Sequence, residues 1–168
     1  GDFIGERFSE VIAGLDVGYR DENVFVVVGT DGSNYFVIDE FVSKESTTSE
    51  LASAIQEKID EWNIDQIYID SAAQQVKADF AYDYDIYCEN AIKSVNDGIN
   101  SLQVLIEQDR LYFDTEGGRH TFSAMSSYKW NPNTETPNLN LTIGLLKINN
   151  SFRRCIRLKR SNRRLSGI

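Results

Sequence analysis

The sequence contains few of the residues that build thiolate metal sites and disulfide frameworks. Its 168 residues include two cysteines, Cys88 and Cys155, and a single histidine, His120, with no Cys-x-x-Cys pair. Zinc sites and disulfide-stapled folds need more of these residues at closer spacing, so both classes are disfavoured. The low cysteine content also predicts a cytoplasmic protein.

Long apolar runs and phosphate-binding loops are missing as well. No apolar stretch approaches the roughly 20 residues that span a bilayer, and residues 1–20 lack a basic-then-apolar signal pattern. There is no GxxxxGK[ST] loop, which argues against an ATP-hydrolysing motor of the P-loop type. With 41% apolar and 26% charged residues, the composition is that of one globular domain with a sizeable core.

Acidic residues are absent from the end of the chain. All 26 of them lie between Asp2 and Glu135, against nine basic residues in the same span. Residues 136–168 carry eight basic residues and no acidic one. The sequence therefore predicts an acidic body followed by a basic segment.

The first half of the body predicts a meander followed by a helix. Stretches 11–18, 23–30 and 34–42 are rich in β-branched and aromatic residues, with the turn signal TDGSN between the last two. Apolar residues then recur at i, i+4, i+8 and i+11 from Leu51, which predicts one face of a helix. Thr47 and Glu50 form a capping-box signature at the start of this helix.

The second half alternates short strands and helices. We expect strands at 66–70, 85–89 and 110–114, and helices at 71–80, 94–108 and 120–130. Ser94 and Asp97 form a second capping-box signature. A meander feeding alternating units of this kind predicts an α/β fold, a mixed sheet with an antiparallel meander plus parallel strands, flanked by helices.

Two aspartates end strands in this arrangement. Asp16 interrupts an apolar run late in the first strand, and Asp70 ends the strand at 66–70. If these two strands are parallel neighbours, both carboxylates reach the edge where open α/β sheets bind ligands. Two such oxygen ligands suit Mg²⁺ or Mn²⁺, and a two-ion site could hydrolyse a phosphodiester. The alternative is that each is a turn or helix-cap residue, Asp70 capping the helix that follows.

The motifs also resemble a known family. GLDVGYRDENVFVVVG, IYIDSAAQQVKADF, AIKSVNDGINSLQVLIEQDRLYF and SYKWNPNTE are similar, in order and spacing, to successive motifs of the nuclease domain of tailed-bacteriophage large terminase subunits. GDFIGERF is similar to the linker after the ATPase domain of that family. The resemblance runs from residue 1 to about residue 137.

The resemblance implies a ribonuclease-H-like nuclease at residues 9–137, after a linker remnant at 1–8. It implies a metal-dependent endonuclease that cuts concatemeric viral double-stranded DNA during packaging in the host cytoplasm, outside the mature virion. Asp16 and Asp70 correspond to catalytic residues that bind Mg²⁺ or Mn²⁺, two ions in all. Lys93 falls in the loop before the third helix, where it could meet a DNA phosphate, and the alternative is an ordinary solvated surface lysine. The implied partners are DNA, the ATPase domain, the small terminase subunit and the portal, with no membrane.

Residues 138–168 depart from the family pattern. The family has a third aspartate on a helix after the YKW segment, whereas this chain has no Asp or Glu after Glu135. Three explanations stay open: a shifted reading frame or cloning change, which the coincidence with the charge change favours; a genuine basic DNA-binding extension; or a third ligand from elsewhere, such as Asp83, Asp85 or Glu116.

Other functions also remain open. A catalytically impaired DNA-binding or scaffold domain would explain the missing acid. The Asp-x-Gly turn at Asp16 also occurs in ATP-binding modules of the actin and sugar-kinase type, but those need a second glycine-rich half that 168 residues do not offer. A Holliday-junction resolvase shares the fold but needs further acids late in the chain.

Overall fold

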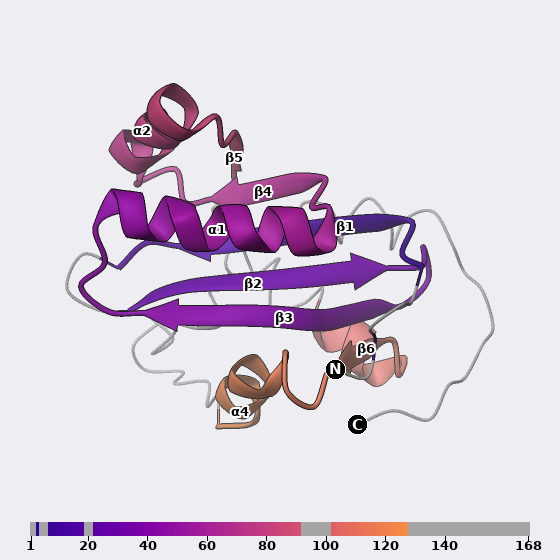
Figure 1. Ribbon diagram of the computed structural model, residues 1–168. Coiled ribbons are helices and arrows are strands. Elements are labelled where there is room, and N and C mark those ends of the chain that lie inside the picture. The colour runs from indigo at the N-terminus through magenta and orange to yellow at the C-terminus, as the bar shows by residue number, and fades with distance from the viewer. Residues whose placement is uncertain (1–2, 4–6, 19–21, 92–101, 128–168) are drawn as a thin grey trace.

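A computed structural model of the chain describes residue 3 and residues 7–18, 22–91 and 102–127 (Figure 1). A short helical segment occupies residues 102–107. In the described ranges, no helix has the length and apolar character needed to cross a membrane. The elements are, in order, β1 (Glu10–Asp16), β2 (Asn23–Thr30), β3 (Tyr35–Ser43), α1 (Thr48–Trp62), β4 (Gln66–Ile69), α2 (Gln74–Tyr84), β5 (Cys88–Asn90), β6 (Leu111–Phe113) and α4 (Arg119–Ser127).

The strands form one mixed sheet in the order β5-β4-β1-β2-β3-β6. Strand β2 is antiparallel to β1 and β3, whereas β1–β4, β4–β5 and β3–β6 are parallel pairs. In Figure 1 the arrows of β1, β3 and β4 accordingly point one way and that of β2 the other. The predicted mixed sheet, its meander and the parallel placement of the fourth strand beside the first are confirmed.

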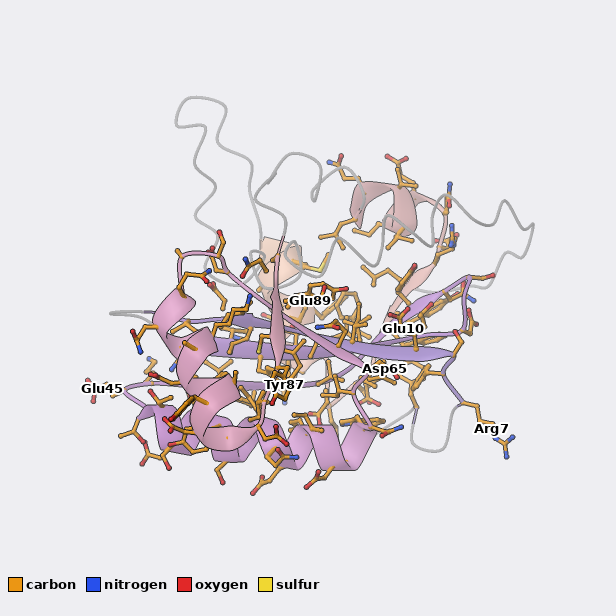
Figure 2. All side chains as sticks on the ribbon, turned by 90° about the horizontal axis from the view of Figure 1, so that it is seen from above. Arg7, Glu10, Glu45, Asp65, Tyr87 and Glu89 are labelled. Carbon is orange, nitrogen blue, oxygen red and sulfur yellow. The ribbon has the colours of Figure 1, made fainter. Side chains whose placement is uncertain are left out.

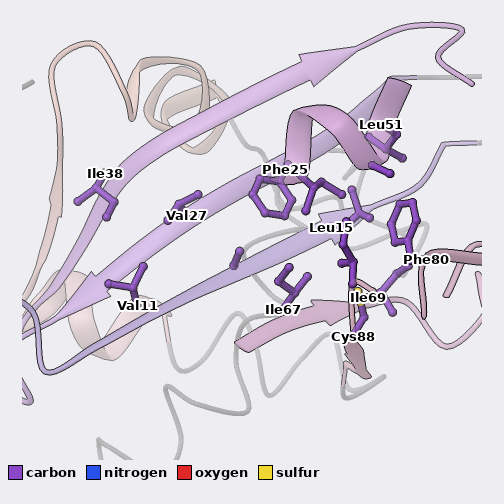
Figure 3. Close-up of a cluster of buried hydrophobic side chains, with 14 residues drawn as sticks. Val11, Leu15, Phe25, Val27, Ile38, Leu51, Ile67, Ile69, Phe80 and Cys88 are labelled. Carbon is purple, nitrogen blue, oxygen red and sulfur yellow. The ribbon is translucent and has the colours of Figure 1, made fainter. Parts of the chain in front are cut away.

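Helices cover both faces of the sheet because its strands are apolar on both sides. Val11, Ala13 and Leu15 of β1 pack under α1 and α2 in one buried cluster (Figure 3). Ile12 lies in the opposite cluster, which includes Leu105 of the 102–107 helix and has Met125 of α4 packed against it. Strand β2 is buried along its whole length, as expected for a strand inside a two-sided core.

Helix α1 forms where the sequence predicts it. The Thr47 side chain accepts a hydrogen bond from the Glu50 amide, and the Glu50 carboxylate accepts one from the Thr47 amide. This reciprocal cap is the predicted capping box. Leu51 and Ile55 are buried on the sheet, and the helix ends at Asn63 in the left-handed conformation.

Helix α2 and strand β5 begin three residues later than predicted. The turn after β4 takes residues 71–73, because the Ala73 amide donates to the carbonyl of Asp70. The helix therefore starts at Gln74 and ends at Asp85, whose φ of 55° is left-handed. The predicted Ser94–Asp97 capping box lies outside the described residues, and of the helix predicted at 94–108 the structure describes residues 102–107.

Candidate functional site

Asp16 and Asp70 occupy equivalent positions on neighbouring parallel strands. The register of β1 with β4 runs from Ile12 opposite Gln66 to Leu15 opposite Ile69. Continued by one residue, it sets Asp16 beside Asp70 at the carboxyl edge of the sheet. Adjacent strands are separated by about 4.8 Å, so the two backbones meet at close range.

The two carboxylates also share a face of the sheet. Side chains alternate along a strand, and Ile12 and Tyr68 belong to the cluster packed against the 102–107 helix. Asp16 lies four residues after Ile12 and Asp70 two residues after Tyr68, so both project to that face. Sequence reasoning predicted the common edge, and the register adds the common face.

Asp16 is half-buried rather than buried. It is the last residue of β1, paired with Val24 of β2. The Gly18 amide donates to the buried Asn23 side chain at 3.1 Å, which fixes the chain just beyond Asp16. The partial exposure explains how a carboxylate is tolerated here, because its charge keeps access to water.

Asp70 holds the turn that leads into α2. Its Oδ1 accepts from the Ala72 amide at 3.0 Å. The N-cap of α2 is Ala73, which makes no side-chain cap hydrogen bond, so the helix-cap alternative for Asp70 is wrong in its literal form. The turn hydrogen bond involves Oδ1 of Asp70.

A polar group on α2 lies next to this edge. Lys77 Nζ donates to Asn90 Oδ1 at 3.1 Å, and Gln74 Nε2 approaches the same oxygen at 3.4 Å. Asn90 ends β5, and Ile69 is its register partner on β4. Sequence reasoning missed this group because it placed the fifth strand at 85–89, which left Asn90 outside the strand end.

The carboxylate pair fits a hard divalent cation in its donor chemistry. Mg²⁺ is commonly held by one or two carboxylates, with waters and substrate phosphates completing its shell. Within the described ranges, no group of three or more His, Cys, Asp or Glu residues is close enough to share one metal ion. Burial raises the pKa of Cys88 to about 11, so that this thiol is protonated at neutral pH.

The alternative third ligands lie elsewhere in the fold. Asp83 and Asp85 are at the C-terminal end of α2, which starts at the edge carrying Asp70 and runs away from it. Glu116 lines a cavity of about 310 Å³ shared with Lys58 and Trp62 of α1. Glu116 follows β6, whose pairing with β3 ends at Val37. The residue of β3 that lies level with Asp16 is Val42, five residues further along β3.

Two sequence predictions fall outside the described residues. Lys93, the predicted DNA contact, lies in the gap at 92–101, and the segment 138–168 lies in the gap from 128 onward. The candidate site therefore rests on Asp16 and Asp70.

Comparisons with known proteins identify the family of the chain. A family model described as a terminase RNase H-like domain matches residues 13–135. The large terminase subunit of Escherichia phage T5 is 37% identical over 130 residues, which are 76% of this chain and 30% of that protein. The chain thus spans about a third of that relative's length.

Solved structures share the fold at low sequence identity. The large terminase of the thermophilic bacteriophage D6E gives a TM-score of 0.75 at 16% identity, over 87% of this chain and 40% of that one. The nuclease domain of the large terminase of bacteriophage SPP1, solved with bound Mn, gives 0.70 at 19% identity, over 86% and 88%.

Proposed function

Since the chain belongs to the terminase RNase H-like domain family, we propose that it is a metal-dependent endonuclease that cuts concatemeric viral double-stranded DNA during genome packaging. The observation that carries this proposal is the register of β1 with β4, which aligns Asp16 with Asp70 on one face. By this proposal the nuclease unit is residues 9–137, and residues 1–8 are a linker from an ATPase domain. The small terminase subunit and the portal would be its packaging partners in the host cytoplasm.

The chemistry requires Mg²⁺ or Mn²⁺ at the aspartate pair. The SPP1 relative was solved with bound Mn, which supports this choice of metal. When bound, two such ions would activate a water molecule and neutralise charge on the scissile phosphate and its leaving oxygen. Asp16 and Asp70 supply the oxygen ligands, and the paired strands hold their backbones in place before DNA arrives.

The absence of an acidic residue at the third family position limits the metal affinity and the cleavage rate that we expect. No Asp or Glu follows Glu135, and Asp83, Asp85 and Glu116 lie away from the aspartate pair. If no acid outside the described residues joins Asp16 and Asp70, at least one ion binds weakly and cleavage is slow. A catalytically impaired DNA-binding domain is the second candidate function, favoured by this same absence.

The decisive test is plasmid cleavage by aspartate variants. Supercoiled plasmid is incubated with Mn²⁺ and the parent chain, Asp16→Asn, Asp70→Asn or Asp60→Asn. We expect the first two variants to lose about 100-fold or more in nicking rate, since each 1.36 kcal/mol of barrier is a factor of ten. Asparagine keeps the side-chain oxygen that accepts from Ala72, so a purely structural Asp70 would tolerate the change.

Asp60 is the matched control, because it is exposed on α1 and hydrogen-bonds only to Gln56 among the contacts described for it. Equal cleavage by all four proteins would contradict the proposal, as would a parent that binds DNA but never cuts it. A parent that requires ATP before it binds metal would instead support an actin-type nucleotide module.

A further inference from the structure

Two lysines lie at the same edge of the sheet as the aspartate pair, one on either side of it. Lys77 lies near the start of α2 and contacts the end of β5, and Lys44 directly follows β3. In the strand order β5-β4-β1-β2-β3, the strands of Asp70 and Asp16 lie between them. Four strand spacings of about 4.8 Å separate β5 from β3, a span of about 19 Å.

Lys77 keeps its full charge available to a ligand. Its ammonium donates to the neutral side-chain oxygen of Asn90, and no acidic partner of Lys77 is described within salt-bridge distance. Gln74 approaches the same Asn90 oxygen and donates to the Ser71 carbonyl at 2.6 Å. These contacts hold the ammonium at the end of β5, and an ammonium has three donor hydrogens, so it can add a phosphate without leaving Asn90.

Lys44 is held only weakly. Its side chain is 73% exposed and pairs with Glu22 at 2.9 Å. Ion pairs this exposed contribute little to stability, so a phosphate can displace Glu22 at small cost. Lys77, which has a neutral partner, and Lys44, whose ion pair is easily displaced, therefore flank the Asp16–Asp70 pair in the strand order with positive charge that a phosphate can bind.

We propose, on the premise of the nuclease function above, that Lys77 and Lys44 are positioning residues that contact DNA backbone phosphates on opposite sides of the scissile phosphate. Phosphates successive along one strand of a duplex advance by about 3.4 Å of helix axis, so a span of about 19 Å corresponds to several nucleotides. The strand between the two contacts then runs along the carboxyl edge of the sheet, which Lys77 approaches from the face covered by α2 and toward whose other face Asp16 and Asp70 project. The net negative charge of the body is no obstacle, since local charge decides approach at short range.

Arg7 offers a matched control. It precedes β1 and so lies at the opposite edge of the sheet. Figure 2 shows Arg7 and Glu45, the neighbour of Lys44, at opposite ends of the molecule. Removing the Arg7 charge changes the net charge as much as removing either lysine does.

The test uses the whole chain with Lys77→Gln, Lys44→Gln, Arg7→Gln and Lys77→Arg. Binding of a labelled duplex oligonucleotide is measured without divalent metal between about 50 and 200 mM salt, and cleavage kinetics are measured with Mn²⁺. We expect each lysine-to-glutamine change to raise KM roughly threefold to tenfold with kcat nearly unchanged. Each should also make the log–log salt dependence shallower by about 0.9, the value of one phosphate contact.

Lys77→Arg should restore the parent values, and Arg7→Gln should match the parent throughout. Lysine variants with the KM and salt dependence of Arg7→Gln would overturn the proposal, as would a fall in kcat alone. The salt dependence of DNA binding is measured without metal and therefore does not depend on a metal site at Asp16 and Asp70. If the nuclease assignment is wrong, the aspartate variants still cut DNA. If only the lysine contacts are wrong, the aspartate variants lose cleavage but the lysine variants bind DNA with the salt dependence of the parent.

Discussion

Gly29 of β2 makes room for an aromatic ring from the start of the chain. A Cβ at this position would lie 2.6 Å from Cγ of Phe8. Phe8 in turn packs on Phe36 of β3, with ring centroids 5.5 Å apart, and Phe3 packs on the same ring at 5.0 Å. Phe3 and Phe8 therefore pack on the sheet through Phe36, and Phe8 also fills the space beside Gly29.

Gly29→Ala should destabilise the fold, because the new methyl group overlaps Cγ of Phe8. Rotation of the Phe8 ring about its Cβ–Cγ bond does not move this atom. We expect a loss of about 1–3 kcal/mol in the free energy of unfolding, measured by urea titration. In a Phe8→Ala background the same change should cost at least about 1 kcal/mol less. Additive losses would mean that the Phe8 ring does not fill this space in solution.

Single residues were predictable where chemistry and strand position coincided. Asp16 and Asp70 were recognisable because burying an unpaired carboxylate at the end of an apolar strand costs free energy. The structure brings both residues to one edge of the sheet. Asn90 and Lys77 carried no such signal. A polar residue in a polar stretch is ordinary, so their proximity follows only from where α2 and β5 begin.

The turn between β2 and β3 depends on one carboxylate. Asp31 Oδ1 accepts from the amides of Ser33 and Asn34, both at 2.8 Å, and Oδ2 accepts from the Asn34 side chain at 3.2 Å. Burial raises the pKa of Asp31, but these hydrogen bonds outweigh it and the pKa lies below its ordinary value of 3.8. The ionised form is thus the one that the folded turn prefers.

The stability contributed by Asp31 should be lost in acid. A carboxyl group whose pKa is lower in the folded state stabilises the fold fully above the unfolded value of 3.8. The contribution then falls as the pH drops through the folded pKa. Asp31→Ala should cost about 1 kcal/mol at pH 7, and the difference from the parent should shrink below pH 3.8 in urea titrations. A difference that stays constant into acid would contradict the ionised turn.

Elements were predictable in proportion to their local signals. Helix α1 has a capping box and a repeating apolar face, and both are in the structure. Helix α2 has only Phe80 fully buried and lacks a side-chain cap, so nothing in its sequence marks its start. The Asp70 turn set that start instead, and it depends on contacts that form only once β4 has ended.

At the scale of the whole molecule, the charge divides the chain at the point where the family pattern stops. The family model matches residues 13–135, and the last acidic residue is Glu135. All eight basic residues of the span 136–168 lie in residues 138–168. The acidic aspartate pair and the basic segment are therefore separable by deletion.

Deleting residues 138–168 should separate DNA affinity from cleavage. Each phosphate that the segment neutralises steepens the log–log salt dependence of binding by about 0.9, so the deletion should weaken binding most at low salt. If this basic segment is a DNA-binding extension, the salt dependence becomes shallower while Asp16 and Asp70 still support Mn²⁺-dependent nicking at saturating DNA. If the segment comes from a shifted reading frame, restoring the natural coding sequence should accelerate cleavage by supplying the third carboxylate. Thermal unfolding of both proteins controls for lost fold, and a deletion that abolishes nicking in a folded chain would place an essential group within the segment.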